Sequence, residues 1–373
     1  AILLLGCLPA VLGVMYALKE EDLKGLLAYS SIDNTGVILI GAGLFCILIA
    51  AGESHLAEMA LLGTLFHAIS HGLFKGLLFL TAGSVCQAAG TRNIDELGGI
   101  LVRMPRTGAL FFIGMAAVCA LPPLNGFAGE LLIYQALILG IIASTPLMQV
   151  VLLIALALFG LCSALTAVCF VKAFGLTFLA LPRTGHARKA REVPLLMQAG
   201  PAILAVACLI TGVCSAQILT LLGFSGYLPD LLVIALLLVL TGVLVFAAVY
   251  AGASRQTRVA ITWGCGLDAP TNRMEYTGSG FTQPVVRIFS PVYRTRLSIT
   301  RQFFDGDSCF MRSGEAEITL MKFFEEYLYL PMARAIDAYA ARVAGLQNGS
   351  LDRYVLYVFL TVIALILIMT GAL

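Results

Sequence analysis

The distribution of apolar and charged residues divides the chain into long apolar segments joined by short polar ones. With a window of about 19 residues, close to the length of a helix that crosses a bilayer, the pattern predicts eight crossings. They lie near residues 1–18, 25–50, 59–88, 107–143, 148–181, 198–223, 230–253 and 353–373. We therefore expect an all-α fold, a polytopic transmembrane helix bundle.

The fourth segment is too long for one straight crossing and carries a polar interruption near its middle. The stretch LPPLNGFAGE, residues 121–130, places two prolines, an asparagine and a glycine there and ends on Glu130. Discontinuous helices recur in ion transporters because their freed backbone groups line a polar cavity. We expect a broken helix with Glu130 at mid-depth; the alternative is a proline kink whose carboxyl is satisfied by a neighbouring helix.

Composition excludes an ordinary soluble domain. The chain is 60% hydrophobic and 12% charged, with a mean hydropathy of +0.96, whereas soluble domains are about 45–50% apolar. Ala1 already lies in an apolar span with no charged region or cleavage site before it, which is not typical of a signal peptide. We expect an N-terminal part of a longer protein to be missing.

The cysteines do not predict a metal or disulfide framework. Eight of the ten lie in apolar spans, and no C-x-x-C pair occurs. Cysteine in such places is a small buried hydrophobe, so we expect no iron–sulfur or zinc site. The eight are Cys7, Cys46, Cys86, Cys119, Cys162, Cys169, Cys208 and Cys214.

The basic residues of the short loops fall on one side of the membrane. The opposite loops, near 51–58, 144–147 and 224–229, contain no Lys or Arg. By the positive-inside rule the basic side is cytoplasmic, which also makes the loop 254–352 cytoplasmic. The basic residues are Lys19, Lys24, Arg92, Arg103, Arg106, Arg183, Arg188, Lys189 and Arg191.

The long loop has two halves of different character. Its first half is rich in Gly, Pro, Thr and Ser and predicts irregular structure. From Glu315 to about Gln347, apolar residues recur at spacings of three and four, which predicts an amphipathic helix kinked at Pro331. This helix fits the membrane surface or a neighbouring subunit; the alternative is a helix of a small soluble lobe.

Ionisable residues inside the spans are the informative positions, because they are costly in a bilayer and tend to mark ion paths. His67, His71 and Lys75 follow one another at i, i+4 and i+8 and so share one helical face. Desolvation makes a deeply placed lysine easier to deprotonate, so the three form a candidate column of proton carriers. The alternative is a snorkelling lysine beside two histidines that pack between helices.

Three further ionisable residues belong to this set. Asp33 lies nine residues deeper than Lys24 in the second span, and Lys172 lies about ten residues before the end of the fifth. Lys24 and Lys172 could instead be interface anchors, and Asp33 could pin a neighbouring helix. Together these groups predict a polar axis along the membrane plane.

Three stretches resemble, in order, signatures of the antiporter-like membrane subunits shared by complex I, Mrp antiporters and membrane-bound hydrogenases. They are EEDLKGLLAYSSIDNTG, HAISHGLFKGLLFLTAGSV and LPPLNGFAGELLIYQAL. The resemblance covers 1–182 and implies the second of two five-helix repeats, with the first absent. Two further spans (183–253), the loop 254–352 with its surface helix and a last span (353–373) would follow.

The resemblance also implies roles for these residues. Lys24 matches the lysine at the helix start, His67, His71 and Lys75 match the central relay, and Glu130 matches the terminal proton site. Asp33 matches an acid of hydrogenase-type members, and Lys172 matches a basic position. The chain would have no catalytic residue or cofactor of its own.

The segment TWGCGLDAPTNRMEYTGSGFTQPVVRIF is similar to the hydrogenase-4 component B and formate hydrogenlyase subunit 3 type. The resemblance implies a non-redox, proton-translocating subunit in a bacterial or archaeal cell membrane. Partner subunits would carry nickel–iron and iron–sulfur centres. A cation/proton antiporter subunit and a structural membrane anchor remain the alternatives.

Overall fold

The structure is a computed structural model of the 373-residue chain. It describes residues 1–254, 256, 259–260, 263–266, 271–293, 296–303, 311–319, 325–345, 347 and 349–370. The chain divides into two compact units, Ala1–Pro284 and Val285–Leu373. The two units are described separately below.

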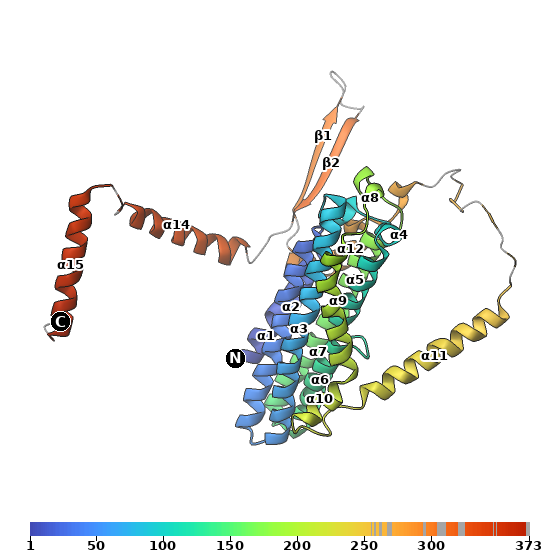
Figure 1. The fold of residues 1–373 in the computed structure, drawn as a ribbon, viewed down its shortest axis with the longest axis horizontal. Coiled ribbons are helices and arrows are strands. Elements are labelled where there is room, and N and C mark those ends of the chain that lie inside the picture. Colours follow the sequence, from blue (N-terminus) through green and yellow to red (C-terminus); the bar gives the residue numbers. More distant parts are fainter. Residues whose placement is uncertain are drawn as a thin grey trace. The chain divides into compact units, whose positions relative to one another are not determined.

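The first unit holds the helical bundle (Figure 1). Its long helices are α1 (Ile2–Lys19), α2 (Leu23–Ala50), α3 (Ser54–Ala89), α5 (Pro105–Val118), α6 (Asn125–Ala143), α7 (Pro146–Phe178), α9 (Leu195–Val213) and α11 (Leu231–Gly252). Its short elements are η1 (Ile94–Glu96), α4 (Ile100–Arg103), α8 (Gly185–Lys189), α10 (Ser215–Leu221) and η2 (Asn272–Met274); α12 (Gly278–Ile288) runs past its end.

The second unit contains α13 (Ser290–Tyr293), the strands β1 (Arg296–Phe303) and β2 (Met311–Thr319), a π-helical turn (Glu325–Tyr329), α14 (Leu330–Ala344) and α15 (Leu351–Met369). The strands pair antiparallel, from Arg296 opposite Thr319 to Phe303 opposite Met311. A bulge between Gln302 and Phe303 shifts the register.

The strands correct one prediction and add to another. The described spans are all helical, as predicted, and the chain adds a two-stranded ribbon to them; the amphipathic helix does not begin at Glu315, because residues 315–319 belong to β2. Ala316 and Ile318 also fit the two-residue period of a strand, and pairing with β1 decides between the two periods. Residues 320–324 lie outside the described part; α14 confirms a helix beyond them, with Pro331 in its first turn, where proline is tolerated, rather than at a kink.

Eight helices among the described residues are long and apolar enough to cross a membrane, and they match the eight predicted spans. The fourth is divided as expected: α5 ends at Val118 and α6 begins at Asn125. At 1.5 Å per residue, the 14 residues of α5 extend only about 21 Å, less than the roughly 30 Å of a bilayer core.

Glycines bring α1 and α2 together with almost no side chain between them. A Cβ at Gly36 would lie 2.3 Å from Ala10 N, and one at Gly13 would lie 2.5 Å from Asp33 N. Gly6 and Gly43 extend the same seam at seven-residue spacing. Small residues allow such contact between membrane helices, where water provides no driving force for association.

The interruption in the fourth span is packed from two sides. A Cβ at Gly126 would lie 1.9 Å from Ala117 O, so the start of α6 lies directly against the end of α5. A Cβ at Gly212 of α9 would lie 2.4 Å from Pro123 O. Helix α9 also contacts α3, which packs against α2, α5 and α6 as well and is the central helix of the bundle (Figure 1).

The loops at the basic end of the bundle contact one another. Arg92 pairs with Asp22 at 3.2 Å, and Arg183 pairs with Asp95 at 3.3 Å. The backbone N–H of Leu23 donates to Arg92 O at 2.9 Å. The loops after α1, α3 and α7 therefore meet at one end, as the alternation of basic loops requires.

Candidate functional site

Among the ionisable side chains buried in the described bundle, three lie on three different helices and carry most of the site. Asp33 on α2, Lys75 on α3 and Glu130 on α6 have exposed fractions of 1%, 5% and 8%. Burying a charged group costs several kcal/mol unless hydrogen bonds or an opposite charge compensate. Each of the three has such partners.

Asp33 is held by two side chains of α7. Cys162 Sγ donates to Asp33 Oδ1 at 2.7 Å, and Thr166 Oγ1 donates to Oδ2 at 3.0 Å. Cys162 lies 3.6 Å from a second acceptor, Ala10 O of α1. The expectation that the cysteines act only as buried hydrophobes is therefore wrong for Cys162.

Lys75 extends from α3 toward α2 and α7. Its Nζ donates to Ser30 Oγ and, at 3.4 Å, to Leu27 O. The same ammonium lies 5.5 Å from the ring centre of Phe170, within the range of a cation–π interaction. Among the described side chains, no carboxylate oxygen lies within 4.0 Å of it, so Asp33 acts on Lys75 through a longer-range Coulomb interaction.

Glu130 follows the interruption by little more than one helical turn. Its Oε2 accepts from Ser163 Oγ of α7 at 3.0 Å, and Ser163 Oγ lies 3.0 Å from Tyr134 OH. The Tyr134 ring stacks on Phe159 with a centroid distance of 4.1 Å. The carboxyl is thus satisfied by a hydroxyl pair between α6 and α7.

One stretch of α7 therefore contacts all three of these buried groups. Cys162 and Thr166 contact Asp33, Ser163 contacts Glu130, and Phe170 faces Lys75. From Ser163 to Phe170 is two helical turns, about 10 Å along the axis. The stretch Cys162–Phe170 brings Asp33, Lys75 and Glu130 into one neighbourhood, as the predicted polar axis requires.

The two histidines share the α3 face with Lys75 without bonding to it. His67 is 1% exposed, and neither of its ring nitrogens has a hydrogen-bond partner; His71 Nε2 has none either. Both rings meet Phe74 edge-on, at 6.2 and 5.7 Å. The predicted column thus exists by position on the helix, without direct hydrogen bonds between its members.

Ser70 connects the histidine face to the interruption. It lies between His67 and His71 on α3 and donates to Asn125 O at 3.4 Å. A Cβ at Gly129 would lie 2.8 Å from His67 Cα, so the backbone of α6 runs against α3 here. The start of α6 therefore lies beside the part of α3 that carries His67 and His71.

Lys24 and Lys172 lie apart from this neighbourhood. Lys24 is half-buried at the start of α2, where its backbone N–H donates to the capping Asp22 carboxylate at 2.8 Å. Lys172, 1% exposed, donates to Leu18 O at 2.7 Å and to Glu20 O at 2.6 Å. Lys172 thus satisfies carbonyl groups at the C-terminus of α1, where a cation is also favoured by the helix dipole.

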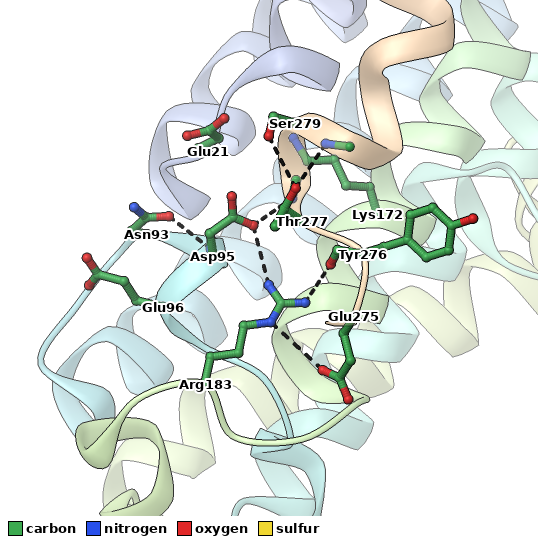
Figure 2. Close-up of polar contacts among 12 residues, drawn as sticks. Glu21, Asn93, Asp95, Glu96, Lys172, Arg183, Glu275, Tyr276, Thr277 and Ser279 are labelled. Carbon is green, nitrogen blue, oxygen red and sulfur yellow. Dashed lines mark hydrogen bonds and ion pairs between the residues drawn. The ribbon is translucent and has the colours of Figure 1, made fainter. Parts of the chain in front are cut away.

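A polar network covers this end of α1 and α7 (Figure 2). Arg183 pairs with Asp95 at 3.3 Å and donates to Tyr276 O at 2.7 Å. Gly278 N donates to Asp95 Oδ1 at 2.6 Å, and a Cβ at Gly278 would lie 3.4 Å from Lys172 Cε. The segment around residues 275–279 is therefore attached directly above Lys172.

Sequence spacing did not predict the polar partners of the buried charges. Ser30, Cys162, Ser163 and Thr166 bond to them, and Tyr134 bonds in turn to Ser163. A signal existed on α7, since residues 163, 166 and 170 recur at helical spacing on one face. No group of three or more His, Cys, Asp or Glu side chains that could hold a metal ion occurs among the described residues.

Comparison with known proteins identifies a family model and several relatives that resemble this chain. Residues 1–159 match the family model described as NADH:quinone oxidoreductase/Mrp antiporter, TM. Hydrogenase-4 component B of Escherichia coli (strain K12) is 30% identical over 397 aligned residues, which cover 98% of this chain and 58% of that protein. Formate hydrogenlyase subunit 3 of the same strain is 38% identical over 311, covering 79% of this chain and 50% of that protein.

A solved structure shares the fold over nearly the whole chain. It is a chain of the membrane-bound sulfane sulfur reductase, an archaeal respiratory membrane complex, with a TM-score of 0.66 and 25% identity. The match covers 99% of this chain and 55% of that one, so this chain spans about half to three-fifths of the length of these relatives. This chain is thus a multi-pass, helical membrane protein whose residues 1–159 match the NADH:quinone oxidoreductase/Mrp antiporter transmembrane family model, and it is similar to hydrogenase-4 component B and formate hydrogenlyase subunit 3.

Proposed function

We propose that this chain conducts protons as a non-redox membrane subunit of a hydrogenase-like, redox-driven complex. One observation carries the proposal: Asp33, Lys75 and Glu130 come from three spans and meet one stretch of α7 inside an apolar bundle. Ionisable residues at such positions in membrane proteins mark ion paths. The similarity to proteins named hydrogenase-4 component B and formate hydrogenlyase subunit 3 supports a hydrogenase-like complex.

The axis runs from Lys75 toward Glu130. Lys75 exchanges protons with Asp33 and with the histidine face of α3, and Glu130 receives the proton beside the interruption. His67 and His71 act through bridging water, because buried nitrogens without protein partners are typical water-binding groups. Lys24 is the entry group at the start of α2, and Lys172 supports the axis by holding the end of α1.

The remaining assignments extend the same proposal. Residues 1–182 form one five-helix antiporter-like repeat with a broken helix, and two spans follow to residue 253. The segment 254–352 lies on the cytoplasmic side with α14 along the membrane surface or a neighbouring subunit, and 353–373 forms the last crossing. Other membrane subunits and peripheral subunits with nickel–iron and iron–sulfur centres complete the assembly, in a bacterial or archaeal cell membrane.

Redox-driven proton uptake by vesicles that contain the native complex tests this function. Lys75→Met and Glu130→Gln are expected to lower uptake at least tenfold while electron transfer to an added acceptor continues. Lys189→Met is the matched control, because Lys189 is exposed on the short helix α8 and should leave uptake unchanged.

Two outcomes would favour the alternatives. Unchanged uptake in both Lys75→Met and Glu130→Gln would make the chain a structural membrane anchor. Sodium-dependent acidification without any electron donor, lost in the same two variants, would make it a cation/proton antiporter subunit.

A further inference from the structure

The Cys162 thiol has two possible acceptors from two different helices. It lies 2.7 Å from Asp33 Oδ1 of α2 and 3.6 Å from Ala10 O of α1. The glycine seam creates this choice, because the close approach of α1 and α2 at Gly13 and Gly36 brings Ala10 and Asp33 to the same side of α7.

The donors around Asp33 match its ionised form. Cys162 donates to Oδ1. Thr166 Oγ1 and, at 3.4 Å, the Asn34 side-chain amide donate to Oδ2. An ionised carboxylate only accepts hydrogen bonds, whereas a protonated carboxyl must donate one. In a site lined by donors, a buried carboxyl that gains a proton needs an acceptor for its new O–H, and a neighbouring donor that turns away supplies one.

The other two donors, Thr166 and Asn34, are less suited than Cys162 to turn away from the Asp33 carboxylate. Asn34 also donates to Ser30 O at 2.8 Å, within its own helix. Thr166 donates to Asp33 Oδ2 at 3.0 Å, the shorter of the two hydrogen bonds to that oxygen. A thiol is a weak donor, so exchanging one acceptor for another changes its energy little.

We propose that Cys162 is a positioning residue for proton transfer at Asp33, with its thiol alternating between Asp33 Oδ1 and Ala10 O. When Asp33 is ionised, the thiol donates to Oδ1. When Lys75 passes a proton to Asp33, the ammonium becomes a neutral amine and the carboxylate a carboxyl. The thiol keeps its own proton and turns to Ala10 O, so the new O–H can point toward sulfur.

This inference rests on the proposed function, since it assumes that Asp33 exchanges protons. Other titratable groups face Asp33 and would contribute to any pH profile. They are Lys75 on α3, Glu130 on α6, Cys119 at the interruption, and Cys162 and Cys169 on α7. From α1, Ala10 and Gly13 contribute backbone and no titratable side chain.

The test combines transport with infrared spectroscopy on the native complex in vesicles. Asp33→Asn identifies the carbonyl band of protonated Asp33 by its loss. Cys162→Ala removes the donor and Cys162→Ser restores one. Cys7→Ala is the matched control, because Cys7 is an equally buried thiol on α1 that is not bonded to a carboxylate.

In Cys162→Ala, the Asp33 carbonyl band should persist to a pH about one unit higher, because a hydrogen bond to a charged group has been lost. The acid limb of the uptake profile should move with it. Cys162→Ser should return both to within a few tenths of a pH unit of the wild type, and Cys7→Ala should move neither.

Two results would overturn the inference and are distinguishable. If Asp33→Asn abolishes uptake while Cys162→Ala leaves the band and the profile unmoved, Cys162 only fills space and the proposed function stands. If neither Asp33→Asn nor Cys162→Ala changes the rate of proton uptake, Asp33 exchanges no proton, and the Asp33 part of the proposed function fails too.

Discussion

Replacing Lys172 with methionine separates two roles that its position allows, support of α1 and transfer of protons. Methionine keeps the length of the side chain but has no donor, so Leu18 O and Glu20 O lose the ammonium that now bonds to them at 2.7 and 2.6 Å. We expect the last turn of α1 to loosen.

The magnitude follows from the geometry. Each hydrogen bond from a charged donor contributes about 1.5–3 kcal/mol, and the favourable position at a helix C-terminus adds a few tenths or more. Relief of the buried charge, 1% exposed in the wild type, offsets part of this loss. The net destabilisation should be about 2–4 kcal/mol.

Hydrogen–deuterium exchange of the complex in nanodiscs measures this effect. At about 1.4 kcal/mol per factor of ten, amides of residues 16–20 should exchange roughly 100-fold faster in Lys172→Met. Lys24→Met is the control, since Lys24 lies at the same end of the bundle and its side chain makes no hydrogen bond in the described structure. If exchange is unchanged in Lys172→Met while proton uptake is lost, Lys172 acts on protons and the capping argument is refuted.

Three further predictions concern packing, the polar network and pH. Gly36→Ala should lower the thermal midpoint of unfolding by several degrees, because its Cβ would lie 2.3 Å from Ala10 N. Gly83→Ala is the control, since open space surrounds Gly83 and its midpoint should stay at the wild-type value. Equal midpoints for the two variants would contradict the packing argument. Arg183→Gln should speed proteolysis of residues 271–284 severalfold through loss of the bonds that hold this segment, and an unchanged cleavage rate would show that they contribute nothing. Tyr227 lies outside the spans and donates to Glu58 Oε2 at 2.6 Å; desolvation, and then this bond, raise the pKa of Tyr227 from 10.0 to about 12. The stability that the bond contributes is present below pH 10 and is lost between pH 10 and 12, so the Tyr227→Phe variant should lose less stability than the wild type in this range. Melting temperatures of the two proteins that fall in parallel with pH would argue against the bond.

The spans and the interruption follow from local chemistry, and the sequence predicts them well. A bilayer demands about 20 apolar residues per helix, and the paired prolines remove backbone donors where α5 ends. The shared face of His67, His71 and Lys75 follows from the 3.6-residue period alone. The two-stranded ribbon did not follow, because 315–319 fits both periods and only its partner strand settles the choice.

What the buried charges contact was decided only by the tertiary structure. Sequence spacing places Asp33, Lys75 and Glu130 at depth, yet it cannot say that one stretch of α7 receives all three, because that depends on how α1, α2, α6 and α7 pack. In the sequence, Cys162 resembles any other buried apolar residue. It gains the Asp33 carboxylate as a partner only when the glycine seam packs α1 against α2. The sequence thus determined which groups are in the membrane, and packing between distant helices determined which of them interact.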